Sequence, residues 1–387
     1  MIHINKNNLL YGIILLGILL ILLEPEIFIY TTFHNVIRYM QDLILIIIFI
    51  FYLKSKNKNI FTISIIAFYV WLLISTFINH GEYSNVIYSM IPTIALILVL
   101  DVFLEKNERI TLLCVAIYCN TIVYLNTCLF IIKPEGLVQA ISPTNQRERS
   151  IYFLGVPNQI GPFIILAILS VGLYCYRYKK KKIFLWLAFA HGLISFVFFT
   201  STTTLLGIGV YLLLLILLHR KNYDFIKFTS VFYFLGISAI QILVVGFQVQ
   251  KFFTYIIYNI LHKDITLSTR TEIWEVAIEK IKTSLWMGFG GIESGRYIVM
   301  GTWKFNAHNI FLQILLFGGL IAIVLFMFLI FKSIRSIYLC ESKSAKYFVF
   351  PSVFVLCLME VAEVYPYILN FLILYLVFYC RKIKAEV

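Results

Sequence analysis

The sequence has 387 residues, of which 61% are hydrophobic and 13% are charged, with a formal net charge of +13. A soluble domain carries roughly 25% charged residues, so this composition excludes an ordinary water-soluble enzyme. Apolar runs long enough to cross a hydrocarbon core of about 30 Å recur along the chain, whereas a membrane β-barrel would show alternating segments of about 10 residues. We therefore expect an all-α, polytopic membrane protein that forms a single integral domain over residues 1–387.

The apolar runs predict about twelve transmembrane helices. No small-residue cleavage site follows the first run, which favours a retained anchor over a signal peptide. The expected spans lie near residues 9–28, 37–53, 60–79, 86–104, 109–132, 157–176, 183–200, 202–219, 227–247, 308–331, 345–361 and 365–380. Two longer polar segments interrupt them, a short loop at 133–156 and a long loop at 248–307.

The basic residues gather in alternate loops between the expected spans. Counted with the N-terminus in the cytoplasm, the loops on that side hold most of the 32 Lys and Arg residues. The positive-inside rule then places both termini in the cytoplasm and both polar loops outside. The positive charge therefore indicates topology, and we expect no nucleic-acid partner.

The long outer loop is expected to contain an amphipathic helix near 269–285. Thr269 and Glu272 fit a capping box, and an apolar stripe with helical spacing follows them. Arg270 lies in the first turn, where the helix dipole favours acids. It either has a specific role there or is an ordinary solvated arginine on the surface. The glycine-rich run at 288–295 has neither a preceding strand nor a following Lys-Ser/Thr, which favours a turn over a phosphate-binding loop.

Further polar residues stand beside the membrane in both outer loops. Arg147 and Arg149 end the short loop, and Asn158 follows at the start of a span. His308 and Asn309 begin another span, where helix capping at the interface is the alternative to a chemical role. Because guanidinium groups bind phosphate bidentately, arginines from both loops could bind a lipid headgroup or a lipid diphosphate.

Three stretches together resemble the bacterial superfamily of O-antigen ligases and polysaccharide polymerases. They are RSIYFLGVPNQIG at 149–161, STRTEIWEVAIEKIKTSLWMGFG at 268–290 and AHNIFLQILLFGGLIAIV at 307–324. The chain is most similar to the capsule-type polymerases, although their usual Gly-His-Pro-Asn reads Gly-Val-Pro-Asn at 155–158. The segment at 199–208 also lacks an arginine that the family often has there.

The resemblance implies an all-helical glycosyltransferase of the C type, with one long extracytoplasmic loop. Its expected activity is polymerisation of lipid-linked oligosaccharide repeat units for a capsular or other surface polysaccharide, in the plasma membrane of a bacterium. Glycan would pass from undecaprenyl diphosphate to an acceptor sugar hydroxyl with inversion and without a metal or cofactor. A chain-length regulator and a flippase of the same pathway are the expected partners, besides the lipid-linked substrate and the bilayer.

Residue roles follow from the same resemblance and from the chemistry of a departing diphosphate. Arginines would neutralise the leaving group, and a histidine would accept the hydroxyl proton. The catalytic candidates are His308, Arg270 and Arg149, and the substrate-binding candidates are Arg147, Asn158, Asn309 and Glu272. Glu272 and Glu293 are alternative bases, whereas Arg296 lies outside the motifs and is expected to be an ordinary loop charge.

Two other functions remain open from the sequence. A ligase of the same superfamily would move a finished glycan onto a lipid, a wall polymer or a protein. A transporter of polysaccharide or lipid-linked sugar would need ionisable groups deep in its spans. Of the candidates Asp101, His191, Glu360 and Glu363, only His191 is expected to lie deep.

Overall fold

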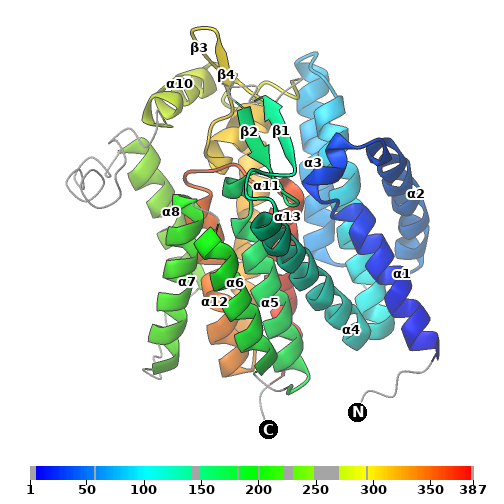
Figure 1. The fold of residues 1–387 in the computed structure, drawn as a ribbon. Coiled ribbons are helices and arrows are strands. Elements are labelled where there is room, and N and C mark those ends of the chain that lie inside the picture. The colour runs from blue at the N-terminus through cyan, green and yellow to red at the C-terminus, as the bar shows by residue number, and fades with distance from the viewer. Residues whose placement is uncertain are drawn as a thin grey trace.

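The computed structural model describes residues 6–55, 58–141, 148–180, 183–198, 201–220, 230–247, 270–292 and 295–384, and most of them are helical (Figure 1). The helices are α1 (Lys6–Leu22), α2 (Phe33–Lys54), α3 (Ile60–Ile78), α4 (Ser84–Ile132), α5 (Gly161–Arg177), α6 (Ile183–Phe198), α7 (Thr202–Arg220), α8 (Ser230–Gln241), α10 (Arg270–Thr283), α11 (Ile310–Leu339), α12 (Lys343–Met359) and α13 (Tyr367–Tyr379). Short helical turns η1 (Glu26–Tyr30) and η2 (Pro157–Gln159) precede α2 and α5, and a π-helical segment at Ile242–Gly246 continues α8.

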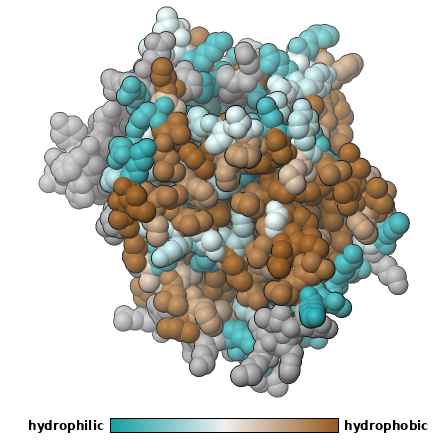
Figure 2. Space-filling view, turned by 45° about the vertical axis from the view of Figure 1, so that its right-hand side comes forward, coloured by the Kyte–Doolittle hydropathy of each residue, from teal (hydrophilic) through white to brown (hydrophobic). Residues whose placement is uncertain are grey.

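The described helices include five that are long and apolar enough to cross a membrane. They are α2, α3, α4, the segment Pro157–Arg177 and α11. Figure 2 shows a broad hydrophobic belt around the middle of the molecule, with hydrophilic side chains gathered above and below it. The protein is therefore a polytopic helical membrane protein, while the count of about twelve spans stays a prediction.

Helix α4 contains two of the expected spans, 86–104 and 109–132, in one helical element of 49 residues. The two parts meet at Asn107, whose φ of −151° and ψ of 79° break the helix. Asn107 Oδ1 accepts a hydrogen bond from the Ile110 amide at 3.2 Å and so caps the second part.

Two small hairpins were not expected in an all-α chain. β1 (Val138–Ile141) pairs antiparallel with β2 (Glu148–Ile151), and β3 (Ile298–Met300) pairs antiparallel with β4 (Trp303–Phe305). They lie within the two polar segments of the sequence. Figure 1 shows both hairpins and α10 at one end of the bundle and the two termini at the other. This arrangement agrees with an assignment of both polar loops to one side of the membrane and of both termini to the other.

The glycine-rich run after α10 packs into a break in α11. Gly319 has a φ of 65°, which interrupts α11 and leaves carbonyl groups before it free to accept. The Phe289 amide donates to Leu316 O at 2.8 Å, the Gly290 amide donates to Phe317 O at 2.9 Å, and the Gly291 amide donates to Thr76 Oγ1 at 2.9 Å. These amides are bonded within the protein, so the run is a turn that joins α10 to α11 and α3, and it does not form a phosphate-binding loop.

Helix α10 is amphipathic as predicted. Ile273, Trp274, Ala277 and Ile281 form its buried stripe, and the helix packs against α11. The expected capping residue Thr269 lies outside the described residues, so that part of the prediction has no structural counterpart. The helix begins at Arg270, which fixes this side chain at the end of a buried element.

Candidate active site

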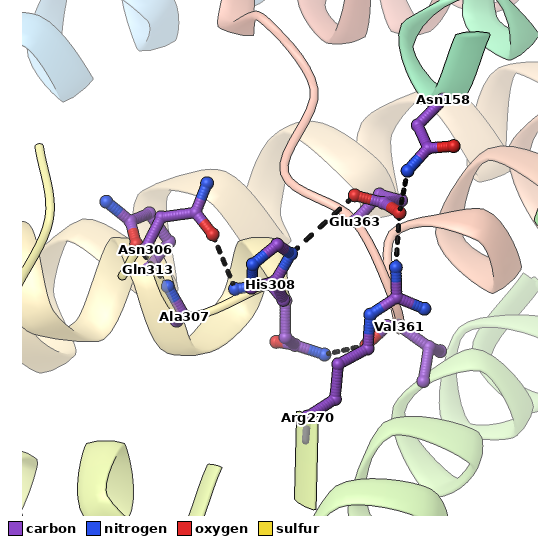
Figure 3. A network of polar contacts seen from close by, with 9 residues as sticks. Asn158, Arg270, Asn306, Ala307, His308, Gln313, Val361 and Glu363 are labelled. Atoms are coloured by element: carbon purple, nitrogen blue, oxygen red, sulfur yellow. Dashed lines mark hydrogen bonds and ion pairs between the residues drawn. The ribbon is translucent and has the colours of Figure 1, made fainter. Parts of the chain in front are cut away.

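Glu363, in the loop between α12 and α13, is the centre of a polar network (Figure 3). Arg270 Nη2 donates to Glu363 Oε1 in an ion pair, and Asn158 Nδ2 donates to the same oxygen at 3.1 Å. His308 Nδ1 lies 3.8 Å from Glu363 Oε2. The network thus joins side chains from η2, α10 and the turn before α11.

Burial makes these contacts stronger than those of a surface ion pair. The exposed fraction of the side chain is 10% for Glu363, 18% for Arg270 and 31% for His308. A partly buried carboxylate needs a charged or hydrogen-bonding partner, and a cation in the first turn of a helix is unfavourable to the helix dipole. The charge of Glu363 therefore offsets the cost of placing Arg270 in the first turn of α10, and the charge of Arg270 offsets the cost of burying the Glu363 carboxylate.

His308 occupies a strained backbone position. Its φ is 44°, in the left-handed region that costs roughly 1–2 kcal/mol for a residue with a Cβ. Two side chains hold this turn, because Asn306 Oδ1 accepts from the His308 amide and Gln313 Oε1 accepts from the Ala307 amide, both at 3.0 Å. The imidazole presents Nδ1 to Glu363 (Figure 3).

Asn309 has a structural role beside this turn. Its Oδ1 caps α11 by accepting from the Leu312 amide at 2.9 Å, and its Nδ2 donates to Gln241 Oε1 at 2.9 Å and to Val361 O at 3.0 Å. The residue is 1% exposed. Asn309 is therefore a helix cap, which confirms the capping alternative. Both N–H groups of its side-chain amide are bonded within the protein, so neither is free for the expected contact with substrate.

A second charged cluster forms around Arg149, at the start of the chain segment that leads from β2 to η2. Burial raises the pKa of Glu26 in η1, and the nearby charge of Arg149 lowers it. Desolvation lowers the pKa of Arg296, and the charge of Arg149 lowers it further. Arg149 therefore lies within electrostatic reach of Glu26 and of Arg296, and Arg296 is partly buried. The expectation that Arg296 is an ordinary loop charge stays a prediction.

The segment between β2 and η2 connects the two clusters. A Cβ at Gly155, where φ is 109°, would collide with the side chains of Glu26 and Gln159. The neighbouring Asn158 donates to Glu363. The tight turn at Gly155 thus places Glu26 beside η2 on one side of this segment and Glu363 on the other.

Two of the remaining sequence candidates, Arg147 and Glu293, lie outside the described residues. Glu272 is exposed on α10. Within the described part of the chain, no group of three His, Cys, Asp or Glu side chains is arranged to hold a metal ion.

Sequence reasoning considered Glu363 only as a group for transport and gave Glu26 no role. A signal for Glu363 was available, because Glu360 and Glu363 are the only acids between residues 345 and 380. No comparable signal marks Glu26, which follows the acid Glu24 in an ordinary interfacial turn.

Comparison with known families gives one finding. Residues 187–327 match the family model described as O-antigen ligase, a region that contains Arg270 and His308 but neither Arg149 nor Glu363. No curated protein matches the chain. The match confirms the resemblance to the superfamily of O-antigen ligases and polysaccharide polymerases.

Proposed function

We propose, from this resemblance to the superfamily of O-antigen ligases and polysaccharide polymerases, that the protein polymerises lipid-linked oligosaccharide repeat units at the outer face of a bacterial plasma membrane. The donor is a glycan on undecaprenyl diphosphate, and the acceptor is a sugar hydroxyl of the next lipid-linked unit. The observation that carries the proposal is the convergence of Arg270, His308 and Asn158 on Glu363, because each of the first three comes from a different sequence motif.

In the proposed reaction, the acceptor oxygen attacks the anomeric carbon as the bond from that carbon to the diphosphate oxygen breaks. The diphosphate leaves with the bonding electron pair, and the hydroxyl proton passes to Nε2 of His308. Glu363 faces Nδ1 at 3.8 Å, so it orients the ring and stabilises the imidazolium that forms. Attack opposite the leaving group inverts the configuration at the anomeric carbon.

Arginine supplies the positive charge that the departing diphosphate needs. The Arg270 guanidinium has five N–H donors, and its hydrogen bond to Glu363 uses Nη2, so other donors remain for a phosphate oxygen. Arg149 lies within electrostatic reach of Arg296 and of the acid Glu26. The two cations and one acid leave a net positive charge at a partly desolvated position, which favours an anionic ligand, and the proposal therefore needs no metal ion.

The proposal also includes a place in the cell. Both termini would be cytoplasmic, the end with α10 and the hairpins would face outward, and a flippase would deliver the substrate to that side. A chain-length regulator would act on the product. The alternative in the same superfamily is a ligase, the activity that the description of the family model names, and it would use the same chemistry with a different acceptor.

The lipid carrier in a deletion strain distinguishes these two activities. Loss of a polymerase should leave single repeat units on the carrier, whereas loss of a ligase should leave long chains on it. Mass spectrometry of carrier-linked glycans from the deletion strain and its parent gives the answer. A carrier pool that is unchanged in both respects contradicts the proposed function.

The arginine roles are tested by lysine substitution, because an ammonium group keeps the charge but lacks the planar fork. We expect Arg270→Lys and Arg149→Lys each to reduce polymer about 10- to 1000-fold at unchanged protein level. Arg335→Lys is the matched control, since Arg335 is exposed near the C-terminal end of α11. Equal output from all three variants contradicts the diphosphate role.

A further inference from the structure

A cavity of about 680 Å³ lies beside the candidate active site. Its walls come from the end of α1, η1, α2, the start of α4, η2 and the loop that enters α13. The volume is within the range of roughly 300–1,000 Å³ that small-molecule sites occupy. None of the residues discussed above as diphosphate ligands lines it, so a different part of the substrate has to be considered.

We propose that this cavity binds sugar rings of the lipid-linked glycan, next to the bond that reacts. The inference rests on the proposed function and adds to it a glycan subsite built largely from the N-terminal third of the chain. This part of the chain lies outside the residues that match the family model.

Unsatisfied polar atoms are the first argument for such a ligand. Four side chains that line the cavity each have a buried polar atom without a hydrogen-bond partner in the described structure. These atoms are Arg38 Nε, Gln159 Oε1, Tyr365 Oη and Tyr367 Oη. More than about 90% of buried polar groups in proteins are hydrogen-bonded, so the four unpartnered groups in this cavity wall are donors and acceptors that a polar ligand can satisfy once their side chains turn toward it.

The chemistry of these atoms selects the ligand. A guanidinium nitrogen only donates, an amide oxygen only accepts, and a phenol does both. A sugar hydroxyl both donates and accepts, so a sugar ring can satisfy all of them. Tyr88, Tyr365 and Tyr367 add aromatic rings to the lining, and their apolar faces suit the C–H faces of a pyranose.

Charge argues against a phosphate or a lipid tail in this place. The lining includes the acids Glu24 and Glu26 and the cation Arg38. Glu24 pairs with His34 at 3.0 Å, and Arg38 donates to Gln41 Oε1 and Tyr88 O at 3.1 and 3.0 Å. The acids of the lining have cationic or titratable partners, so the lining has no excess of positive charge to select an anion, and its polar atoms disfavour a hydrocarbon chain. A neutral polyhydroxyl ligand therefore fits best.

The cavity meets the active site through two short chain segments. Tyr365 follows Glu363 by two residues, and its phenol lies within electrostatic reach of Glu363 and Arg270. Gln159 is adjacent to Asn158, which donates to Glu363. A sugar ring in the cavity would therefore lie beside the carboxylate that positions His308.

The test uses full-length protein in lipid nanodiscs and two probes. One probe is undecaprenyl diphosphate, and the other is the same lipid carrying its oligosaccharide, purified from a strain that lacks this chain. We expect wild type to bind the oligosaccharide form more tightly. Tyr365→Phe and Tyr367→Phe should each weaken that form about 3- to 10-fold, the effect of one lost hydrogen bond, and leave undecaprenyl diphosphate unchanged.

The phenylalanine variants are chosen because neither phenol has a hydrogen-bond partner among the described residues, so their removal should not lower the thermal unfolding temperature. Tyr39→Phe is the matched control, since Tyr39 is 74% exposed on α2. Phe variants that keep the full preference for the oligosaccharide overturn the subsite. Equal binding of both probes by wild type also overturns it while the proposed function stands, whereas a failure to bind either probe contradicts the function itself.

Steady-state turnover shows which sugar occupies the cavity. A raised KM for the single-unit acceptor assigns the cavity to the acceptor, and a raised KM for the polymer donor assigns it to the donor. Both results support a glycan subsite. Unchanged KM values for both substrates in Tyr365→Phe overturn it.

Discussion

Replacing Glu363 by glutamine removes one negative charge and keeps the shape of the side chain. The amide oxygen can still accept from Arg270 and Asn158, so the network should stay in place. The change acts on His308, whose Nδ1 lies 3.8 Å from the carboxylate. At this separation and an effective dielectric constant of about 20, the carboxylate stabilises an imidazolium by about 4 kcal/mol, which corresponds to roughly a thousandfold in rate.

Screening reduces that value, because 31% of the His308 side chain is exposed. We therefore expect Glu363→Gln to lower polymer formation about 100- to 1000-fold in vesicles that contain purified protein and lipid-linked oligosaccharide. Glu360→Gln is the matched control, since Glu360 is fully buried three residues earlier and neither of its carboxyl oxygens has a hydrogen-bond partner in the described structure. Turnover of Glu363→Gln within about threefold of wild type, at equal protein level, would refute the proposed role of the carboxylate.

Two further predictions test the turn that carries the base and the junction that holds α10. His308→Asn should keep the thermal unfolding temperature, because asparagine tolerates positive φ, but it should lose turnover about 10²–10⁴-fold; full activity assigns the base elsewhere. Gly290→Ala places a Cβ 2.6 Å from Thr76 Cα and should lower the thermal unfolding temperature. Gly301→Ala is the control, because Gly301 has a similar positive φ but no atom within 4 Å of the added Cβ, so its unfolding temperature should fall much less. Equal shifts in the two variants contradict steric packing as the cause.

The helices were largely predictable because their length and apolar character are local properties. The run at 60–79 predicts a span, and α3 covers Ile60–Ile78. The pattern at 269–285 predicts an amphipathic helix, and α10 covers Arg270–Thr283. The hairpins were missed because strands of three or four residues are too short for an alternating pattern to stand out.

The site was predictable only in part, because its centre depends on contacts between distant segments. Arg270, His308 and Asn158 lie in recognisable motifs. Glu363 does not, and it is 205 residues from Asn158 and 93 residues from Arg270 along the chain. No local sequence pattern indicates that these side chains meet. Only the packing of α10, η2 and the loop before α13 shows that they all contact the Glu363 carboxylate.

This shared carboxylate gives the proposed mechanism a definite order of events. Without substrate, Glu363 is the anion that holds Arg270 at the N-terminal end of α10. In the proposed mechanism, a diphosphate would accept from the remaining N–H donors of Arg270 and so share this guanidinium with Glu363. Sharing the positive charge would reduce its neutralising effect on Glu363. The carboxylate would then stabilise more strongly the imidazolium that forms when the acceptor hydroxyl gives its proton to His308.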